Sequence, residues 1–206
     1  GILMEVRKVS FEINKKACIT KEEREFLIEA YRKLFIKIYG CDMLEALANL
    51  TQTSSNKWLR RKGLQKYAEN QIRALDVMNS VENDENFDLL VIRDEESKII
   101  GGGRLRKISD TEASVPDITI EGSSVKDERE IWRQAIIFAE EYFTNLGYEK
   151  MYVEIPLQDG PLLGRASQMG FFEDPKDMRV TDATRTYLVN KTLERVQDEK
   201  LSTSRK

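Results

Sequence analysis

Residues 125–172 decide the fold: VKDEREIWRQAIIFAEEYFTNLGYEKMYVEIPLQDGPLLGRASQMGFF. In the first part of this stretch, apolar residues recur at helical spacing: Ile131, Ala135, Phe138, Tyr142 and Leu146. Because residues at this spacing lie on one face of a helix, the pattern predicts an amphipathic helix over 126–146. Gly147 follows at the place where helices commonly end in a left-handed residue.

The second part of the stretch predicts a strand and a short helix. Residues 148–157 alternate and reach Pro156, which is typical of a strand that leaves a sheet. Residues 159–161, Asp-Gly-Pro, predict a turn. A short helix then leads to the pair Gly170 and Phe171.

Upstream of this stretch, the clearest feature is a hairpin with strands over 87–92 and 99–108. Its second strand contains three consecutive glycines, 101–103. Glycines inside a strand indicate a bulge, or another backbone or a ligand that approaches closely. A nucleotide-binding glycine loop is a poor alternative, because no helix follows these glycines. Two further strands are predicted, one over 114–125 and one over 184–193. Within the first of these ranges, residues 122–124 form the turn into the long helix.

The N-terminal part is predicted to be mostly helical. After an edge strand over 4–13, Thr20 and Glu23 form a capping box that begins a helix ending near Gly40. More helical segments are expected over 43–50 and 58–81. A chain of 206 residues is long enough for one domain with a real core. We therefore expect a single domain over 1–193, with a helical segment over 14–82 inserted between the first two strands, and a charged tail over 194–206.

The composition excludes several function classes. A net charge of −3 argues against a general nucleic-acid binder, which needs a surplus of basic residues. No apolar run is long enough to span a bilayer, and no secretory signal is recognisable, so no membrane association is expected. The two cysteines, Cys18 and Cys41, cannot form a disulfide scaffold, which favours a reducing cytoplasm.

The chain has no histidine. Catalysis by Ser-His-Asp or Cys-His groups is therefore excluded, and so are zinc sites with histidine ligands. We expect no metal site. Any general base must be a carboxylate, a lysine, a tyrosine or a water that they hold.

Two blocks of the deciding stretch resemble the GCN5-related N-acetyltransferases: 139–157 (AEEYFTNLGYEKMYVEIPL) and 165–172 (RASQMGFF). They are similar to that family's pattern of a helix, Leu-Gly-Tyr, a strand, and a helix ending in Gly-Phe. The residues GGGRLR at 101–106 also resemble a strand element of the family. The resemblance implies an α/β fold whose mixed, mostly antiparallel central sheet is flanked by helices, here with an enlarged N-terminal helical segment.

The resemblance also implies an activity. Members of the family move an acetyl group from acetyl-CoA to an amine, so the expected acceptor is the amine of a small molecule or peptide, attacked directly in a ternary complex. A homodimer is possible. One alternative is a catalytically silent protein of the same fold that senses a ligand or binds a partner. Another is an acyltransferase that uses acyl carrier protein.

The implied cosubstrate site is the start of the long helix, where unpaired amides and the helix dipole favour a pyrophosphate. Its expected residues are Gly122, Ser123, Val125, Lys126, Arg129, Glu130 and Ile131. Counting back from Gly147, the family's Arg/Gln-x-x-Gly-x-Gly/Ala loop falls on Asp127, Glu130 and Trp132. The alternative for Asp127 is a capping box with Ser124.

The implied catalytic residue is Glu121, a carboxylate near the end of the central strand that would act as general base. Asp117 and Glu154 are weaker candidates. The family's acid is a tyrosine four residues before Gly-Phe, and that position is Ala166 here. Ser167 and Tyr152 are the possible substitutes.

Overall fold

The computed structural model describes residues 8–15, 18–39, 42, 86–174 and 186–194. The chain divides into two compact units, residues 1–15 with 86–206, and residues 16–85. The predicted helices over 43–50 and 58–81 and the tail after Glu194 lie outside the described residues.

The described helix of the second unit is α1, Lys21–Tyr39. Its start confirms the predicted capping box. The Glu23 amide donates to Thr20 Oγ1 at 3.1 Å, and the Thr20 amide donates to Glu23 Oε2 at 3.4 Å. The sequence therefore fixes the first turn of this helix by two reciprocal bonds.

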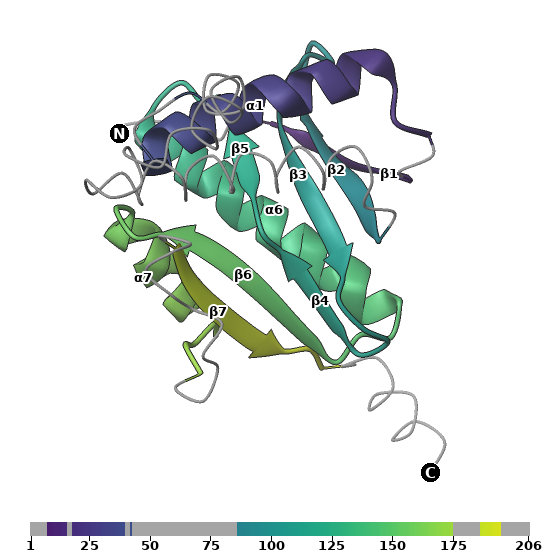
Figure 1. The fold of residues 1–206 in the computed structure, drawn as a ribbon, viewed down its shortest axis with the longest axis vertical. Coiled ribbons are helices and arrows are strands. Elements are labelled where there is room, and N and C mark those ends of the chain that lie inside the picture. The colour runs from purple at the N-terminus through teal and green to yellow at the C-terminus, as the bar shows by residue number, and fades with distance from the viewer. Residues whose placement is uncertain (1–7, 16–17, 40–41, 43–85, 175–185, 195–206) are drawn as a thin grey trace, which may run out of the picture. The chain divides into compact units, whose positions relative to one another are not determined.

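The first unit is a seven-stranded sheet with two helices among its described residues (Figure 1). Its elements are β1 (Ser10–Lys15), β2 (Phe87–Arg93), β3 (Ile99–Lys107), β4 (Glu112–Val115), β5 (Ile118–Ile120), α6 (Val125–Asn145), β6 (Lys150–Pro156), α7 (Gly160–Gln168) and β7 (Thr186–Thr192). The strand order is β1-β2-β3-β4-β6-β7, and β5 pairs with β3. The β4–β6 pair is parallel and the other pairs are antiparallel. No helix within the described ranges is long and apolar enough to cross a membrane.

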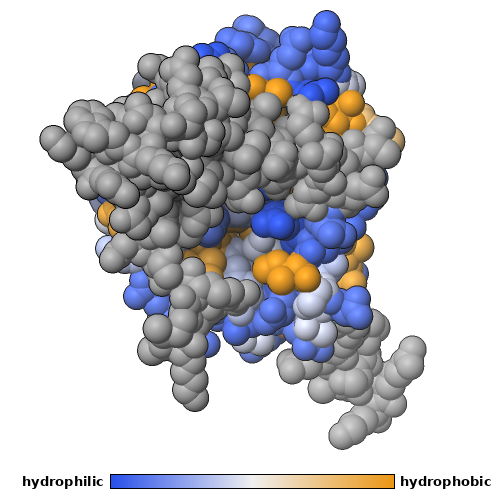
Figure 2. Space-filling view, viewed as in Figure 1, coloured by the Kyte–Doolittle hydropathy of each residue, from blue (hydrophilic) through white to orange (hydrophobic). Residues whose placement is uncertain are grey.

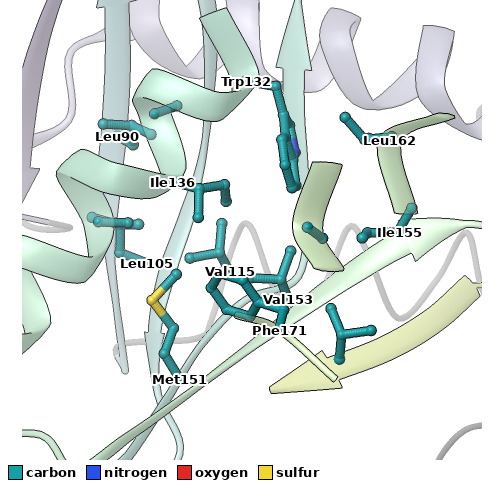
Figure 3. Close-up of a cluster of buried hydrophobic side chains, with 14 of the residues drawn as sticks. Leu90, Leu105, Val115, Trp132, Ile136, Met151, Val153, Ile155, Leu162 and Phe171 are labelled. Atoms are coloured by element: carbon teal, nitrogen blue, oxygen red, sulfur yellow. The ribbon is translucent and has the colours of Figure 1, made fainter. Parts of the chain in front are cut away.

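The core lies between the sheet and α6, which crosses one face of the sheet (Figure 1). Alternate residues of the strands point toward this helix, as the two-residue period of a strand requires. The cluster drawn in Figure 3 includes Leu90, Leu105, Val115, Trp132, Ile136, Met151, Val153, Ile155, Leu162 and Phe171. Exposed apolar side chains are scattered over several described elements, and the coloured part of the surface in Figure 2 is mostly hydrophilic with small apolar patches.

Several predicted elements are confirmed within one or two residues. The predicted helix over 126–146 is α6, and Gly147 has a φ of 91°, as expected for its cap. The predicted strands over 148–157 and 184–193 are β6 and β7. The period of 3.6 residues and the glycine cap are strong local signals, which explains this agreement.

Two predicted strands are wrong in detail. The strand over 114–125 is in fact β4 and β5, which are separated at Pro116 and Asp117 because proline cannot donate a ladder hydrogen bond. The first strand begins at Ser10 and runs to Lys15, two residues past the expected end. The residues before position 8 lie outside the described part of the chain.

The three glycines of β3 admit other backbones at close range. A Cβ on Gly101 would lie 2.6 Å from the Thr119 carbonyl oxygen, and one on Gly102 would lie 2.6 Å from that of Leu90. A Cβ on Gly103 would overlap the carbonyl oxygen of Asp117. The close approach of neighbouring backbones is therefore confirmed, and a register shift between the Ile92–Gly101 and Arg93–Ile99 pairs also puts an irregularity of the bulge type beside these glycines.

A buried carboxylate ties α6 to one end of the sheet. Asp88 on β2 accepts hydrogen bonds from Tyr142 Oη at 2.6 Å and from Lys15 Nζ at 3.1 Å, and Lys107 Nζ lies 3.5 Å away. Burial raises the pKa of the Asp88 carboxyl, but these hydrogen bonds and the Lys107 charge outweigh it and hold the pKa below its ordinary value. Burial and the Asp88 carboxylate raise the pKa of Tyr142.

We expect Asp88 to make stability depend on pH at the acid end. Because its pKa is lower in the folded chain than in the unfolded chain, its contribution is present above about pH 4 and is lost as the pH falls through the folded value. Tyr142→Phe should lower the free energy of unfolding by about 1.5–3 kcal/mol at pH 7, the range for a hydrogen bond to a charged group. Urea unfolding at pH 7 and at pH 3 measures both effects. A loss for Tyr142→Phe that is equal at the two pH values would contradict this account.

Candidate functional site

The sheet splits beside the start of α6. β4 pairs with β6 as far as Val115 and Val153. After Pro116 and Asp117 the chain continues as β5, whose residues pair with β3 and not with β6. β6 meanwhile continues to Pro156 against β7. The facing edges of β5 and of the last part of β6 are therefore not hydrogen-bonded to each other.

A buried ion pair lies at the point where the sheet splits. The Asp117 carboxylate accepts bonds from the guanidinium of Arg104, at 3.0 Å from Nε and 2.7 Å from Nη2, and from the Arg104 backbone amide at 3.1 Å. Both side chains are 8% exposed. The pair fixes β3 to the residues between β4 and β5. Asp117, a weaker candidate for the general base, is thus engaged in an ion pair.

Glu121, the expected general base, directly follows β5. Its backbone amide donates to the Ile100 carbonyl at 2.6 Å, which extends the pairing with β3 by one residue. Its side chain is exposed, at the end of the strand that forms one side of the split. Glu154, the other weaker candidate, lies on β6 on the opposite side and is half-buried.

The turn before α6 holds two carboxylates of the helix itself. The Gly122 amide donates to Glu128 Oε1 at 3.3 Å, and the Ser123 amide donates to Asp127 Oδ2 at 2.9 Å. Ser124 caps the helix by accepting from the Asp127 amide at 3.1 Å. The first bond of the capping-box alternative, from the Asp127 amide to the Ser124 hydroxyl, is thus confirmed. In the reciprocal bond, the Asp127 carboxylate accepts from the amide of Ser123 and not from that of Ser124.

Val125 and Lys126 begin the helix and are exposed. Within the described part of the chain, their backbone amides have no hydrogen-bond acceptor. Such amides, together with the helix dipole, attract an anion. Of the expected cosubstrate residues, these two lie best for that role.

Three arginines of α6 and α7 form ion pairs with two acidic residues at the contact of these helices. Arg129 Nη2 lies 3.3 Å from Asp159 Oδ1, and its buried Nε has no hydrogen-bond partner among the described residues. Arg133 and Arg165 lie 2.8 and 3.4 Å from the two oxygens of Glu130. The hydrogen bond from Arg133 holds the pKa of Glu130 below its ordinary value. The expected binding residues Arg129 and Glu130 therefore join the two helices in this structure.

Ile131 and Trp132 belong to the core. Their side chains are 1% and 5% exposed. Figure 3 shows Trp132 in the cluster that also contains Leu162 and Ile155. Ile131 therefore offers no side chain to a ligand at the turn, and the tryptophan at the family's last glycine position packs inward.

The structure describes the three positions considered for a general acid. Ala166 is fully buried and has no polar side chain, and Ser167 is exposed on α7. The Tyr152 hydroxyl donates to Glu112 Oε1 at 3.3 Å, toward the beginning of β4 and away from the split.

Comparison with solved structures assigns the fold. No family model matches the sequence, and no curated protein matches it significantly. The chain is similar to mutant forms of the spermidine/spermine N-acetyltransferase from Vibrio cholerae, with 15% identity, a TM-score of 0.51, and coverage of 96% of this chain and 99% of that one. It is also similar to spermidine N-acetyltransferase of the same organism in complex with CoA and spermine, with 11% identity, a TM-score of 0.52, and coverage of 90% and 95%. A domain from Methanocaldococcus jannaschii matches at 15% identity and a TM-score of 0.52, over 90% of this chain and 100% of that one.

The chain has the fold of the GCN5-related N-acetyltransferases. The predicted α/β class with a mixed, mostly antiparallel sheet is confirmed. The enlargement of the N-terminal helical segment and the single domain over 1–193 stay predictions.

The turn fits the diphosphate implied by the acetyltransferase fold only in part. The amides of Val125 and Lys126 and the Lys126 ammonium group suit such an anion. The amides of Gly122 and Ser123 already donate to carboxylates, whose charges oppose it. The amide of Glu121 is also engaged, because it donates to the Ile100 carbonyl.

The Arg104–Asp117 pair was not predicted from the sequence. Arg104 lies on β3 and Asp117 lies thirteen positions later, between β4 and β5, and no local period relates them. The available signal was that Asp117 is the one charged residue in the segment 113–120. The sequence comparison put Asp127 and Glu130 at positions of the family's loop, but the bonds of Asp127 and Glu128 to the turn were not predicted.

Proposed function

We propose that this chain is an N-acetyltransferase that moves an acetyl group from acetyl-CoA to an amine of a small molecule or peptide, by direct attack in a ternary complex. The similar Vibrio cholerae structure that holds CoA and spermine supports this choice of cosubstrate and acceptor class. A cytoplasmic location and a homodimer stay predictions.

The split between β5 and β6 beside the start of α6 is the observation that carries the proposal. The facing strand edges offer backbone groups with which an extended ligand can pair. The first amides of α6 attract an anion. Acetyl-CoA matches both features, since it would supply an acetyl thioester on an amide-containing arm and a diphosphate.

Glu121 is the proposed general base. An alkylamine with a pKa of about 10.4 is protonated at neutral pH and has no lone pair for attack. The exposed Glu121 carboxylate at the end of β5 takes this proton, directly or through a water. A thiolate leaving group with a pKa of about 8.5 needs little help from an acid, which agrees with Ala166 at the tyrosine position.

Replacing this carboxylate tests its role. Glu121→Gln should lower kcat/KM for acetyl transfer at pH 7.5 by about a hundredfold, as expected for removal of a general base. The loss should shrink toward pH 10, because the free amine then forms without help. Thiol release measured across this pH range gives both results.

Glu149→Gln is the matched control, since Glu149 is exposed and lies just before β6. Its rate should equal that of the unchanged chain. If Glu121→Gln also leaves the rate unchanged at every pH, Glu121 has no part in proton transfer.

A second candidate is a protein of the same fold that binds a ligand or partner without turnover. The carboxylates of Asp127 and Glu128 at the turn favour it, as does Ala166 in place of a tyrosine.

Titration with CoA, followed by thiol release with an amine panel, separates the two candidates. The panel should include spermidine, spermine and a lysine-containing peptide. Saturable binding with turnover of at least one amine supports the enzyme. Saturable binding without turnover of any amine favours the second candidate. Absence of both binding and turnover would overturn the proposed function.

A further inference from the structure

In the turn that precedes α6, the first two backbone amides already have hydrogen-bond acceptors. The choice of a diphosphate as the ligand for this turn rests on the proposed function. Gly122 donates to Glu128 Oε1 and Ser123 donates to Asp127 Oδ2. The Ser123 hydroxyl also donates to Asp127 Oδ2, at 3.2 Å. The carboxylate oxygens thus take the places that anionic ligand oxygens would take at these donors.

The two carboxylates also pack closely against the turn. A Cβ on Gly122 would lie 2.5 Å from Glu128 Cγ and 3.0 Å from Asp127 Oδ2. A phosphate oxygen at hydrogen-bond distance from these amides would need the same volume. A ligand cannot bind there while both side chains keep their positions.

The charges around the turn also disfavour the binding of an anionic ligand. The guanidinium groups of Arg129, Arg133 and Arg165 are each within 3.4 Å of a carboxylate oxygen from Glu130 or Asp159. These three cations therefore share two carboxylates of the chain, Glu130 and Asp159. An incoming diphosphate would meet two carboxylates at the turn and three cations whose charge is partly compensated.

We propose that Asp127 and Glu128 form an internal anionic cap on the turn 122–124, and that a diphosphate group binds there only after this cap is displaced. The cap lowers the affinity of the turn for diphosphate ligands. Both side chains are half-buried and lie in the first turn of the helix, so rotation of the side chains is enough to release the amides.

Calorimetric titration of the full chain tests the cap, with inorganic pyrophosphate and CoA as separate ligands. The variant Asp127→Ala/Glu128→Ala should bind both ligands about tenfold or more tightly than the unchanged chain, because two negative charges near the ligand are removed. The control is Glu141→Ala, an exposed glutamate of the same helix outside the turn, which should leave both affinities unchanged. A second variant, Asp127→Asn/Glu128→Gln, keeps the shape and removes the charge, and should also bind more tightly.

The outcomes separate this inference from the proposed function. If both variants bind pyrophosphate more tightly but CoA does not bind any of the proteins, the cap is supported and the proposed function fails. If CoA binds the unchanged chain tightly and the variants no better, the cap is refuted and the function stands. If the variants only melt at a lower temperature and neither affinity changes, the carboxylates serve the helix start alone and the cap is refuted.

Discussion

Asp117→Ala should lower the free energy of unfolding by about 3–5 kcal/mol, because it removes one partner of a buried ion pair. Asp117 and Arg104 are both 8% exposed, and their contact is 2.7 Å long. The change would leave the Arg104 guanidinium buried without this carboxylate and would remove the acceptor of the Arg104 backbone amide. Urea unfolding followed by circular dichroism measures the loss.

The matched control is the less buried pair between Arg93 and Glu12. Its contact is equally short, at 2.6 Å, but its side chains are 23% and 40% exposed. Glu12→Ala should therefore cost only about 0–1 kcal/mol. If Asp117→Ala costs no more than this control, the pair does not hold the residues at which the sheet splits.

Gly103→Ala should also destabilise the chain, by about 3 kcal/mol. The added Cβ would overlap the carbonyl oxygen of Asp117, and a backbone atom cannot move without disturbing the pairing of β3 with β5. The expected value is at the upper end of the range for overpacked sites because the obstacle is not a flexible side chain.

Gly164→Ala provides the opposite control. Gly164 lies inside α7, and a Cβ there would meet no atom within 4 Å. Since alanine is the better helix former, this change should raise stability by about 0.5–1 kcal/mol. Equal melting temperatures for Gly103→Ala and Gly164→Ala would contradict the packing of β3 described above.

The predictions from sequence succeeded where the signal is local. The helical spacing from Ile131 to Leu146 and the cap at Gly147 located α6 to within one residue at either end. The capping box of Thr20 and Glu23 located the start of α1. Each of these features depends on residues a few positions apart, so the sequence contains the whole interaction.

The predictions were incomplete where the structure depends on pairing between distant strands. The segment over 114–125 was expected to be one strand, whereas Pro116 and Asp117 separate β4 from β5. Both halves pair with β3, and only β4 also pairs with β6, which depends on the register of distant strands that no local pattern specifies.

At the candidate site, the sequence predicted the positions of residues but not the contacts of their side chains. The sequence placed Glu121, Gly122 and Ser123 near the start of the long helix, and the structure has them in that turn. It did not predict that Asp127 and Glu128 reach back to the turn, because that depends on side-chain rotamers. The distinction matters, since an open turn and a capped turn differ in what they bind.

We expect acetyl-CoA to lie in the split between β5 and β6 with its diphosphate at the start of α6. Amide hydrogen exchange of the full chain, with and without saturating acetyl-CoA, tests this most directly. We predict slower exchange over 122–131 and over 154–157, the two sides of that site. Acetyl-CoA that binds with no protection in either segment would contradict the account.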